Sequence, residues 1–228
     1  MIEFFAAIAI FLAAHVLPAA TGLRALLIAK LGRPVYLGLY SLVSLATIAW
    51  VIAAALAAPY IELWPPSRAT ALVPLVAMLP ASILLAGALW QPSPLSVSFR
   101  GGPADPHESH GRAGLVTQLR HPLLWAFFLW AASHLVANGD LVSLILFGSL
   151  AVFSLAGMKR MEGRARQRLS ASEVAAAEAL TSGGPLTRLR RVAPLRGLLD
   201  LVLGVVVYGA VLHLHEPVIG IAPLAWVY

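Results

Sequence analysis

The chain has 228 residues, of which 60% are hydrophobic and only 11% are charged, and its formal net charge is +6. Soluble domains carry about a quarter charged residues, so this chain lacks the polar surface that a water-soluble protein needs, and its long apolar runs indicate membrane helices. The absence of cysteine excludes disulfides, thiolate metal sites, iron–sulfur clusters and thiol catalysis. The positive charge does not indicate a nucleic-acid partner, because the basic residues lie beside apolar runs, as membrane topology requires.

The apolar runs predict an all-α, polytopic transmembrane bundle of about six spans that forms a single domain over residues 1–228. The acidic Glu3 and the direct continuation into further spans favour a first membrane helix over a cleavable signal peptide. The spans are expected over residues 2–20, 36–57, 70–90, 122–137, 141–158 and 195–215.

Basic residues alternate between the loops and so predict the orientation of the bundle. Lys and Arg collect after the first, third and fifth spans, whereas the loops between them hold almost none. The positive-inside rule then places the basic loops in the cytoplasm and both termini outside, as in a multi-pass protein of a bacterial inner membrane. Residues 159–194 form the largest basic cytoplasmic segment. A helix over 159–181 is expected either to lie on anionic membrane lipid or to be solvated, and both alternatives stay open.

Two histidines inside predicted spans are candidate metal ligands. His15 lies nine residues, roughly 13 Å of helix, from the basic residue Arg24, which places it near mid-membrane. His134 lies about 20 Å along its helix from the cytoplasmic end. Buried polar groups in a membrane need partners, and two imidazoles on different helices can hold a b-type haem. Because the chain has no cysteine, such a haem must be bound non-covalently.

The remaining histidines form weaker candidates. Arg120 and His121 precede a proline that begins a helix, where they are expected to bind a propionate, a phosphate or a carboxylate, or to anchor the helix at lipid headgroups. His215, near the outer end of the last span, is a rival haem ligand to the other two. Asn138 shares the helix face of His134 and is expected to orient a ring nitrogen. The loop histidines His107 and His110 have a spacing that permits metal binding but is common by chance.

The run HPLLWAFFLWAASHLVANGDLVSLILFG, residues 121–148, resembles the signature of the NnrU family of bacterial integral membrane proteins. The stretches AAHVLPAATGLRALLIAKLG, YLGLYSLVSL, WQPSPLSVSFR and HEPVIGIAPL are similar to the same family. The resemblance implies an association with the production of nitrite and nitric oxide reductases in denitrifying bacteria, without a mechanism.

A related haem b enzyme, 15-cis-zeta-carotene isomerase, is similar in the same two regions. That resemblance implies haem ligands at His15 and His134, and it maps further motif positions onto Arg24 and His121. The isomerase has a cysteine where this chain has Ala131, so an exchange of haem ligands through that thiol is not expected here.

The sequence is therefore compatible with three functions. The first is a haem-binding membrane protein with isomerase or redox activity on an apolar small molecule, and the second is a non-enzymatic assembly or signalling factor with an unidentified protein partner. The third is a membrane methyltransferase, because the Arg-His-Pro motif also resembles the S-adenosylmethionine site of isoprenylcysteine methyltransferases. The paired glutamates of that group are replaced here by Met161-Glu162-Gly163.

Overall fold

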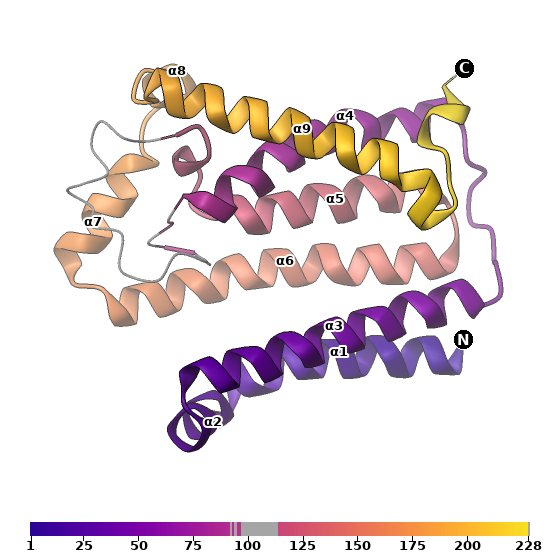
Figure 1. Cartoon of the computed structure of the whole chain (residues 1–228), viewed down its shortest axis with the longest axis horizontal. Coiled ribbons are helices and arrows are strands. Elements are labelled where there is room, and N and C mark those ends of the chain that lie inside the picture. Colours follow the sequence, from indigo (N-terminus) through magenta and orange to yellow (C-terminus); the bar gives the residue numbers. More distant parts are fainter. Residues whose placement is uncertain (92, 94, 97–113, 228) are drawn as a thin grey trace. The chain divides into compact units, whose positions relative to one another are not determined.

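The computed structural model describes residues 1–91, 93, 95–96 and 114–227 (Figure 1). Within these ranges the chain is helical, and the only β pairing is an isolated bridge between Glu62 and Asp140. The helices form two compact units. The first comprises Met1–Leu63 with Asp140–Leu146, and the second comprises Trp64–Gly139 with Phe147–Tyr228.

The first unit is built from α1 (Ile2–Ala20), α2 (Leu23–Leu31) and α3 (Arg33–Ala57). Helices α1 and α2 are bent by 74° relative to each other. Gly22 and Gly32 adopt φ values of 71° and 79°, which side chains disfavour, and so both ends of α2 are glycines. The apolar core of the unit joins α1 and α3 to the start of α6 through Phe4, Ala7, Ile8, Val51, Ala54 and Val142.

The second unit is organised around α4 (Arg68–Trp90), which packs against both α5 (Pro122–Asn138) and α9 (Pro194–Ile219) (Figure 1). Its other elements are η1 (Val116–Gln118), α7 (Ala171–Leu180), α8 (Pro185–Leu189), η2 (Pro223–Trp226) and the part of α6 (Leu141–Arg168) that begins at Phe147. Proline begins α5, α8, α9 and η2, in the first helical turn where its missing N–H is not needed.

Glycines set how closely elements approach α4. A Cβ on Gly204 of α9 would lie 2.5 Å from the Cα of Ile83, so these two helices meet backbone to backbone. A Cβ on Gly87 would overlap Val116, whose buried side chain seats η1 on α4. Small residues at helix interfaces are typical of membrane proteins, in which close packing replaces the hydrophobic effect as the driving force.

The prediction of an all-helical membrane protein agrees with the structure, which has four to five candidate spans. Helices α3, α4, α6 and α9 are long and apolar enough to cross a membrane, and the bent pair α1–α2 is the fifth candidate. Many of their large apolar side chains are exposed, including Leu45 (66%) and Leu56 (80%), as lipid-facing residues should be. Helix α5 is apolar but has only 17 residues, so the six-span count stays a prediction, as do the sides of the termini and the single domain.

The helix expected over 159–181 is divided in the structure. Residues 159–168 continue α6, and a new helix, α7, starts after Ser170. Ser170 and Glu173 form a reciprocal capping box, in which each side chain accepts a hydrogen bond from the other residue's backbone N–H. The cap at Ser170 therefore begins a separate helix within the range in which the basic pattern predicts a single helix.

Candidate functional site

His134 lies on the last turns of α5, in the second unit. Its Nδ1 lies 2.8 Å from the carbonyl oxygen of Trp130, one helical turn earlier. A carbonyl can only accept, so Nδ1 carries the proton and the Nε2 lone pair remains available as a base or a ligand. The rings of Trp130 and Phe147 flank the imidazole, with centroids 5.9 and 5.4 Å away.

His215 of α9 faces His134 within the same unit. The two ring centroids are 6.4 Å apart and the ring planes differ by 20°. The Nδ1 of His215 lies 2.8 Å from the carbonyl oxygen of Ile221, which the positive-φ turn at Gly220 brings back toward the helix. The same reasoning makes Nδ1 the donor of His215, so the neutral forms of the two imidazoles have the same tautomer.

His15 of α1, in the first unit, has the same local geometry. Its Nδ1 lies 2.7 Å from the carbonyl oxygen of Phe11, and its ring contacts those of Phe11 and Tyr40 at centroid distances of 4.3 and 5.7 Å. Arg24, the downstream basic residue of the motif, is an exposed residue of α2. Phe11 and Tyr40 therefore hold the imidazole in an aromatic setting.

Asn138 does not orient the imidazole of His134, contrary to the expectation from its spacing. Its side-chain amide donates to the backbone carbonyl of His134 at 2.8 Å, because a side chain at position i+4 reaches the carbonyl one turn back. The ring nitrogen is oriented by Trp130 instead. Asn138 thereby supports the end of α5, where Gly139 adopts a left-handed conformation.

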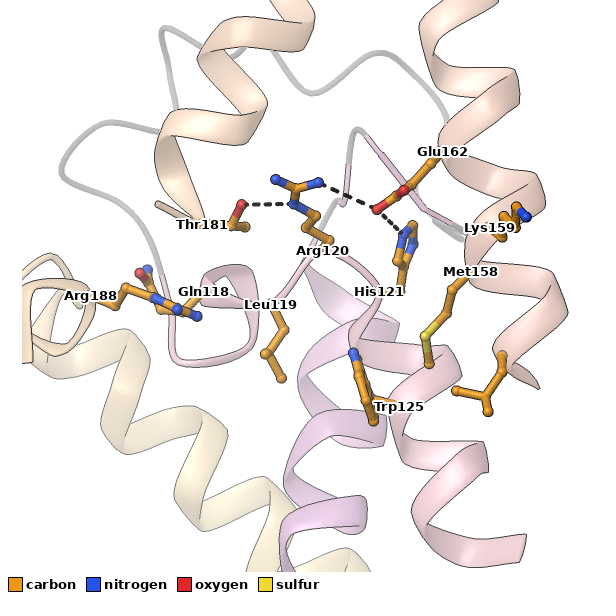
Figure 2. A pocket seen from close by; sticks show the side chains of 11 residues that line it. Gln118, Leu119, Arg120, His121, Trp125, Met158, Lys159, Glu162, Thr181 and Arg188 are labelled. Carbon is orange, nitrogen blue, oxygen red and sulfur yellow. Dashed lines mark hydrogen bonds and ion pairs between the residues drawn. The ribbon is translucent and has the colours of Figure 1, made fainter. Parts of the chain in front are cut away.

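Arg120 and His121 lie at the other end of α5, thirteen residues or about 20 Å of helix from His134. Both contact Glu162 of α6, as Figure 2 shows: the carboxylate oxygen Oε1 is 3.5 Å from Nη1 of Arg120 and 3.4 Å from Nε2 of His121. Arg120 also donates from Nε to the hydroxyl of Thr181 at 3.4 Å. These contacts join the start of α5 to α6 and to the residue that follows α7.

A cavity of about 490 Å³ opens beside this cluster (Figure 2). Burial lowers the pKa of His121 below its usual range, and the hydrogen bond to Glu162 opposes this shift only in part. The imidazole is therefore neutral near pH 7. The cavity is lined by Gln118, Leu119, Arg120, His121, Trp125, Leu155, Met158, Lys159, Glu162, Thr181 and Arg188.

The cavity contains residues that the sequence pattern did not single out. Gln118 looks like an ordinary loop residue, and Lys159 and Arg188 look like general topology charges. Glu162 resembles one member of an incomplete glutamate pair, Met161-Glu162-Gly163. It lies forty-one residues after His121, and no periodicity connects the two positions, so only the structure reveals the contact.

A family model described as "NnrU protein" matches residues 3–223, nearly the whole chain. The chain belongs to the NnrU family. No curated protein and no solved structure gives a significant match.

For this NnrU protein, the structure sorts the predicted site residues into three groups. His134 and His215 come together in the second unit, with Asn138 on the adjoining backbone. Arg120 and His121 form part of the cavity, and His15 and Arg24 belong to the first unit. His107 and His110, the loop pair, lie outside the described residues. Among the residues that are described, no group of three or more His, Asp or Glu side chains is placed to hold a metal ion.

Proposed function

We propose that this NnrU-family chain is a membrane haem b protein whose axial ligands are the imidazoles of His15 and His134, with His215 as the rival for the second position. The observation that carries the proposal is the shared tautomer: each Nδ1 is paired with a backbone carbonyl at 2.7–2.8 Å. Ligating histidines characteristically donate their other ring N–H in this way, which fixes the ring and makes the ligating nitrogen more basic.

The chemistry of the donor set fits a porphyrin better than a bare metal ion. A haem iron needs only two axial side chains because the macrocycle supplies the other four nitrogens, so a cluster of three protein ligands is not required. The aromatic rings beside His15 and His134 offer the apolar surroundings that a macrocycle packs against. Arg24 is proposed to neutralise a propionate, whereas Arg120 and His121 lie about 20 Å along α5 from His134, too far to act at the same haem.

The proposed activity is isomerisation or electron transfer on an apolar small molecule, in the setting of nitrite and nitric oxide reductase production. When bound, the haem would supply a Lewis-acidic or redox-active iron. The protein's own part would be to present imidazole nitrogens to the haem and to exclude water with apolar helices. The ring of His215 lies close to that of His134, so it would offer a second imidazole at that position.

A non-enzymatic role is the alternative, and one observation favours it. The end of α6 and the segment around α8 present several exposed arginines, including Arg160, Arg168 and Arg190, which would suit an acidic protein partner or anionic lipid. In that case the histidines would only stabilise helix ends through their carbonyl contacts.

The absorption spectrum of the protein purified in mild detergent tests the proposal. We expect a Soret band and, on reduction, sharp α and β bands that are lost or shifted in His134→Ala and in His15→Ala. His213→Ala is the matched control, because this exposed residue lies on α9 two positions from His215 and should leave the spectrum unchanged.

The same series identifies the second ligand. If His15→Ala keeps a six-coordinate spectrum and His215→Ala loses it, the axial pair is His134–His215. Full colour in both His15→Ala and His134→Ala would exclude the assignment, and a folded, colourless wild-type protein after haem supplementation would favour the non-enzymatic role.

A further inference from the structure

Helix α8 is a short helix that presents its two leucines outward. Leu186 and Leu189 lie three positions apart, so they share one side of the helix, and they are 75% and 58% exposed. Arg188 lies on another side of the helix, where it is half-buried and lines the cavity beside α5 (Figure 2). A helix on a water-covered surface has the opposite arrangement, with leucines packed inward and arginines in solvent. Helix α8 therefore has an apolar side that no residue in the described part of the chain covers.

Contacts on the other sides of α8 fix it beside the start of α9. The backbone N–H of Val192 donates to the carbonyl of Leu189 at 3.1 Å, so the chain leaves α8 in a tight turn. Val192 packs against α9, because a Cβ added to Gly197 would lie 2.7 Å from its Cγ1. Arg191 donates from Nη1 to the carbonyl oxygen of Ala179 at 2.8 Å, which joins the same turn to the end of α7. The leucines are thus held outward by a helix that packs on its neighbours.

The apolar side of α8 is followed along the chain by an apolar surface of α9. Leu195 and Leu198, in the first turns of α9, are exposed, and so are Val202, Val205 and Val206 further along. Because α9 is a candidate membrane span, these exposed side chains are suited to lipid acyl chains. Only four residues separate α8 from α9, and Figure 1 shows α8 beside the N-terminal end of α9. The leucines of α8 therefore lie near the level at which acyl chains meet headgroups.

The charge around α8 favours an anionic partner. Residues 179–199 contain no aspartate or glutamate and four arginines, Arg188, Arg190, Arg191 and Arg196. Within the described part of the chain, no carboxylate lies within ion-pairing distance of any of the four. Arg196 is placed over the ring of Trp90, at 5.8 Å from its centroid, whereas Arg190 is exposed. The segment therefore combines an uncompensated positive charge with an exposed apolar side.

We propose that α8 docks on anionic phospholipid in the leaflet in which α9 begins. Leu186 and Leu189 insert among the acyl chains, and the neighbouring arginines lie at the headgroup phosphates, as long basic side chains do at a membrane interface. An acidic protein would match the arginines but would leave the two leucines without an apolar partner. Because Arg188 belongs to the same helix, the docking also positions the α8 side of the cavity beside α5.

Site-specific fluorescence in nanodiscs tests the depth of α8. The chain has no cysteine, so Leu186→Cys or Leu189→Cys in the full-length protein carries a single bimane label. In nanodiscs of phosphatidylcholine and phosphatidylglycerol, we expect lipid-borne nitroxides to quench both labels and the water-soluble quencher acrylamide to reach neither. Labels at these exposed positions disturb no packed side chain, and the melting temperature of each variant checks its folding.

Two further labels provide the matched controls. Leu198→Cys, on the exposed side of α9, is the reference for a residue in lipid. Gln167→Cys is the reference for a residue in water, because it is exposed and lies roughly 39 Å along α6, beyond the ~30 Å thickness of the hydrocarbon core. If acrylamide quenches both α8 labels as strongly as the label at Gln167→Cys, and lipid-borne nitroxides quench neither, the docking is overturned and the leucines are left to a soluble partner.

A second measurement tests the preference for anionic lipid. With the label at Leu189→Cys, nitroxide-labelled phosphatidylglycerol should quench more strongly than nitroxide-labelled phosphatidylcholine at the same mole fraction. Each arginine near a membrane surface enriches anionic lipid by up to about fivefold, so Arg190→Gln should reduce this preference several-fold. Arg160→Gln removes the same charge from an exposed residue of α6 and should retain the preference.

Two results of that measurement would contradict the proposal. Equal quenching by the two lipids in the Leu189→Cys protein would overturn the anionic headgroup. Equal loss of the preference in Arg190→Gln and Arg160→Gln would show a general attraction to basic residues and overturn the site at α8. Each label is read with and without quencher in one preparation, so the outcome is independent of whether the protein binds haem.

Discussion

Asp200 of α9 accepts a hydrogen bond from the side-chain amide of Gln91, the residue at which α4 ends, and none of the surface of Asp200 is exposed. Its second oxygen accepts from the backbone N–H of Leu115 at 2.7 Å. Gln91 completes the network by accepting from the N–H of Gly114 through Oε1 at 3.2 Å. One buried carboxylate therefore fixes the end of α4 and the segment that leads into η1 and the cavity.

Asp200→Asn should destabilise the protein by about 1–3 kcal/mol, because the new amide places a donor against one of the two donors that the carboxylate now satisfies. We expect the melting temperature in detergent to fall by several degrees, since the segment before Gln118 loses its anchor. Glu216→Gln, an exposed change on the same helix, should leave the melting temperature unchanged. Unchanged melting in Asp200→Asn would mean that the network contributes nothing net.

The Asp200 network is an example of a long-range contact that the sequence does not predict, although the sequence does predict the helices that make it. The apolar runs and the prolines predict α1, α4 and α5 to within a few residues, because helix formation in a membrane depends on local composition. Asp200 lies inside a predicted span, but its partners are 85 and 109 positions away, and no periodicity connects them. In the same way, the sequence names His134 and His215 as rivals, while only the packed second unit places them face to face.

Gly204 is predicted to be required for the packing of α9 on α4, unlike Gly209 one and a half turns later. An added Cβ at Gly204 meets the Cα and side chain of Ile83, whereas nothing lies within 4 Å of one at Gly209. Gly204→Ala should therefore cost about 1–3 kcal/mol through overpacking, and Gly209→Ala should be neutral or stabilising by up to about 1 kcal/mol through helix propensity. Thermal unfolding of the two variants side by side makes the comparison, and equal melting temperatures would contradict the backbone-to-backbone contact.

Asn138 is predicted to act on the backbone and not on the cofactor. Its amide donates to the carbonyl of His134, so Asn138→Ala should lower the melting temperature by a few degrees and leave any haem spectrum unchanged. Substitution of His134 should have the opposite pattern, with loss of colour and a smaller effect on melting. A shifted Soret band in Asn138→Ala would contradict this prediction and would show that Asn138 affects the haem site.

His121 is predicted to make the stability of the protein decrease on acidification. Burial lowers its pKa in the folded state, with Arg120 acting in the same direction and Glu162 against it. A histidine in the unfolded chain has a pKa of about 6.5, so the unfolded state takes up more protons once the pH falls below that value. Above it the ring is neutral in both states, and the contribution of His121 to the pH dependence disappears.

The contribution of His121 is measured by comparing the melting temperatures of the wild type and of His121→Gln at pH 7.5 and at pH 5.5. Groups that titrate elsewhere affect both proteins equally, so the fall on acidification should be smaller in the variant by an amount attributable to His121. His213→Gln removes an exposed histidine and should retain the pH dependence of the wild type. If His121→Gln also retains it, the ring is not held neutral by burial. The reverse result, a wild type that gains stability on acidification relative to the variant, would mean that the ion pair with Glu162 outweighs the desolvation of the ring.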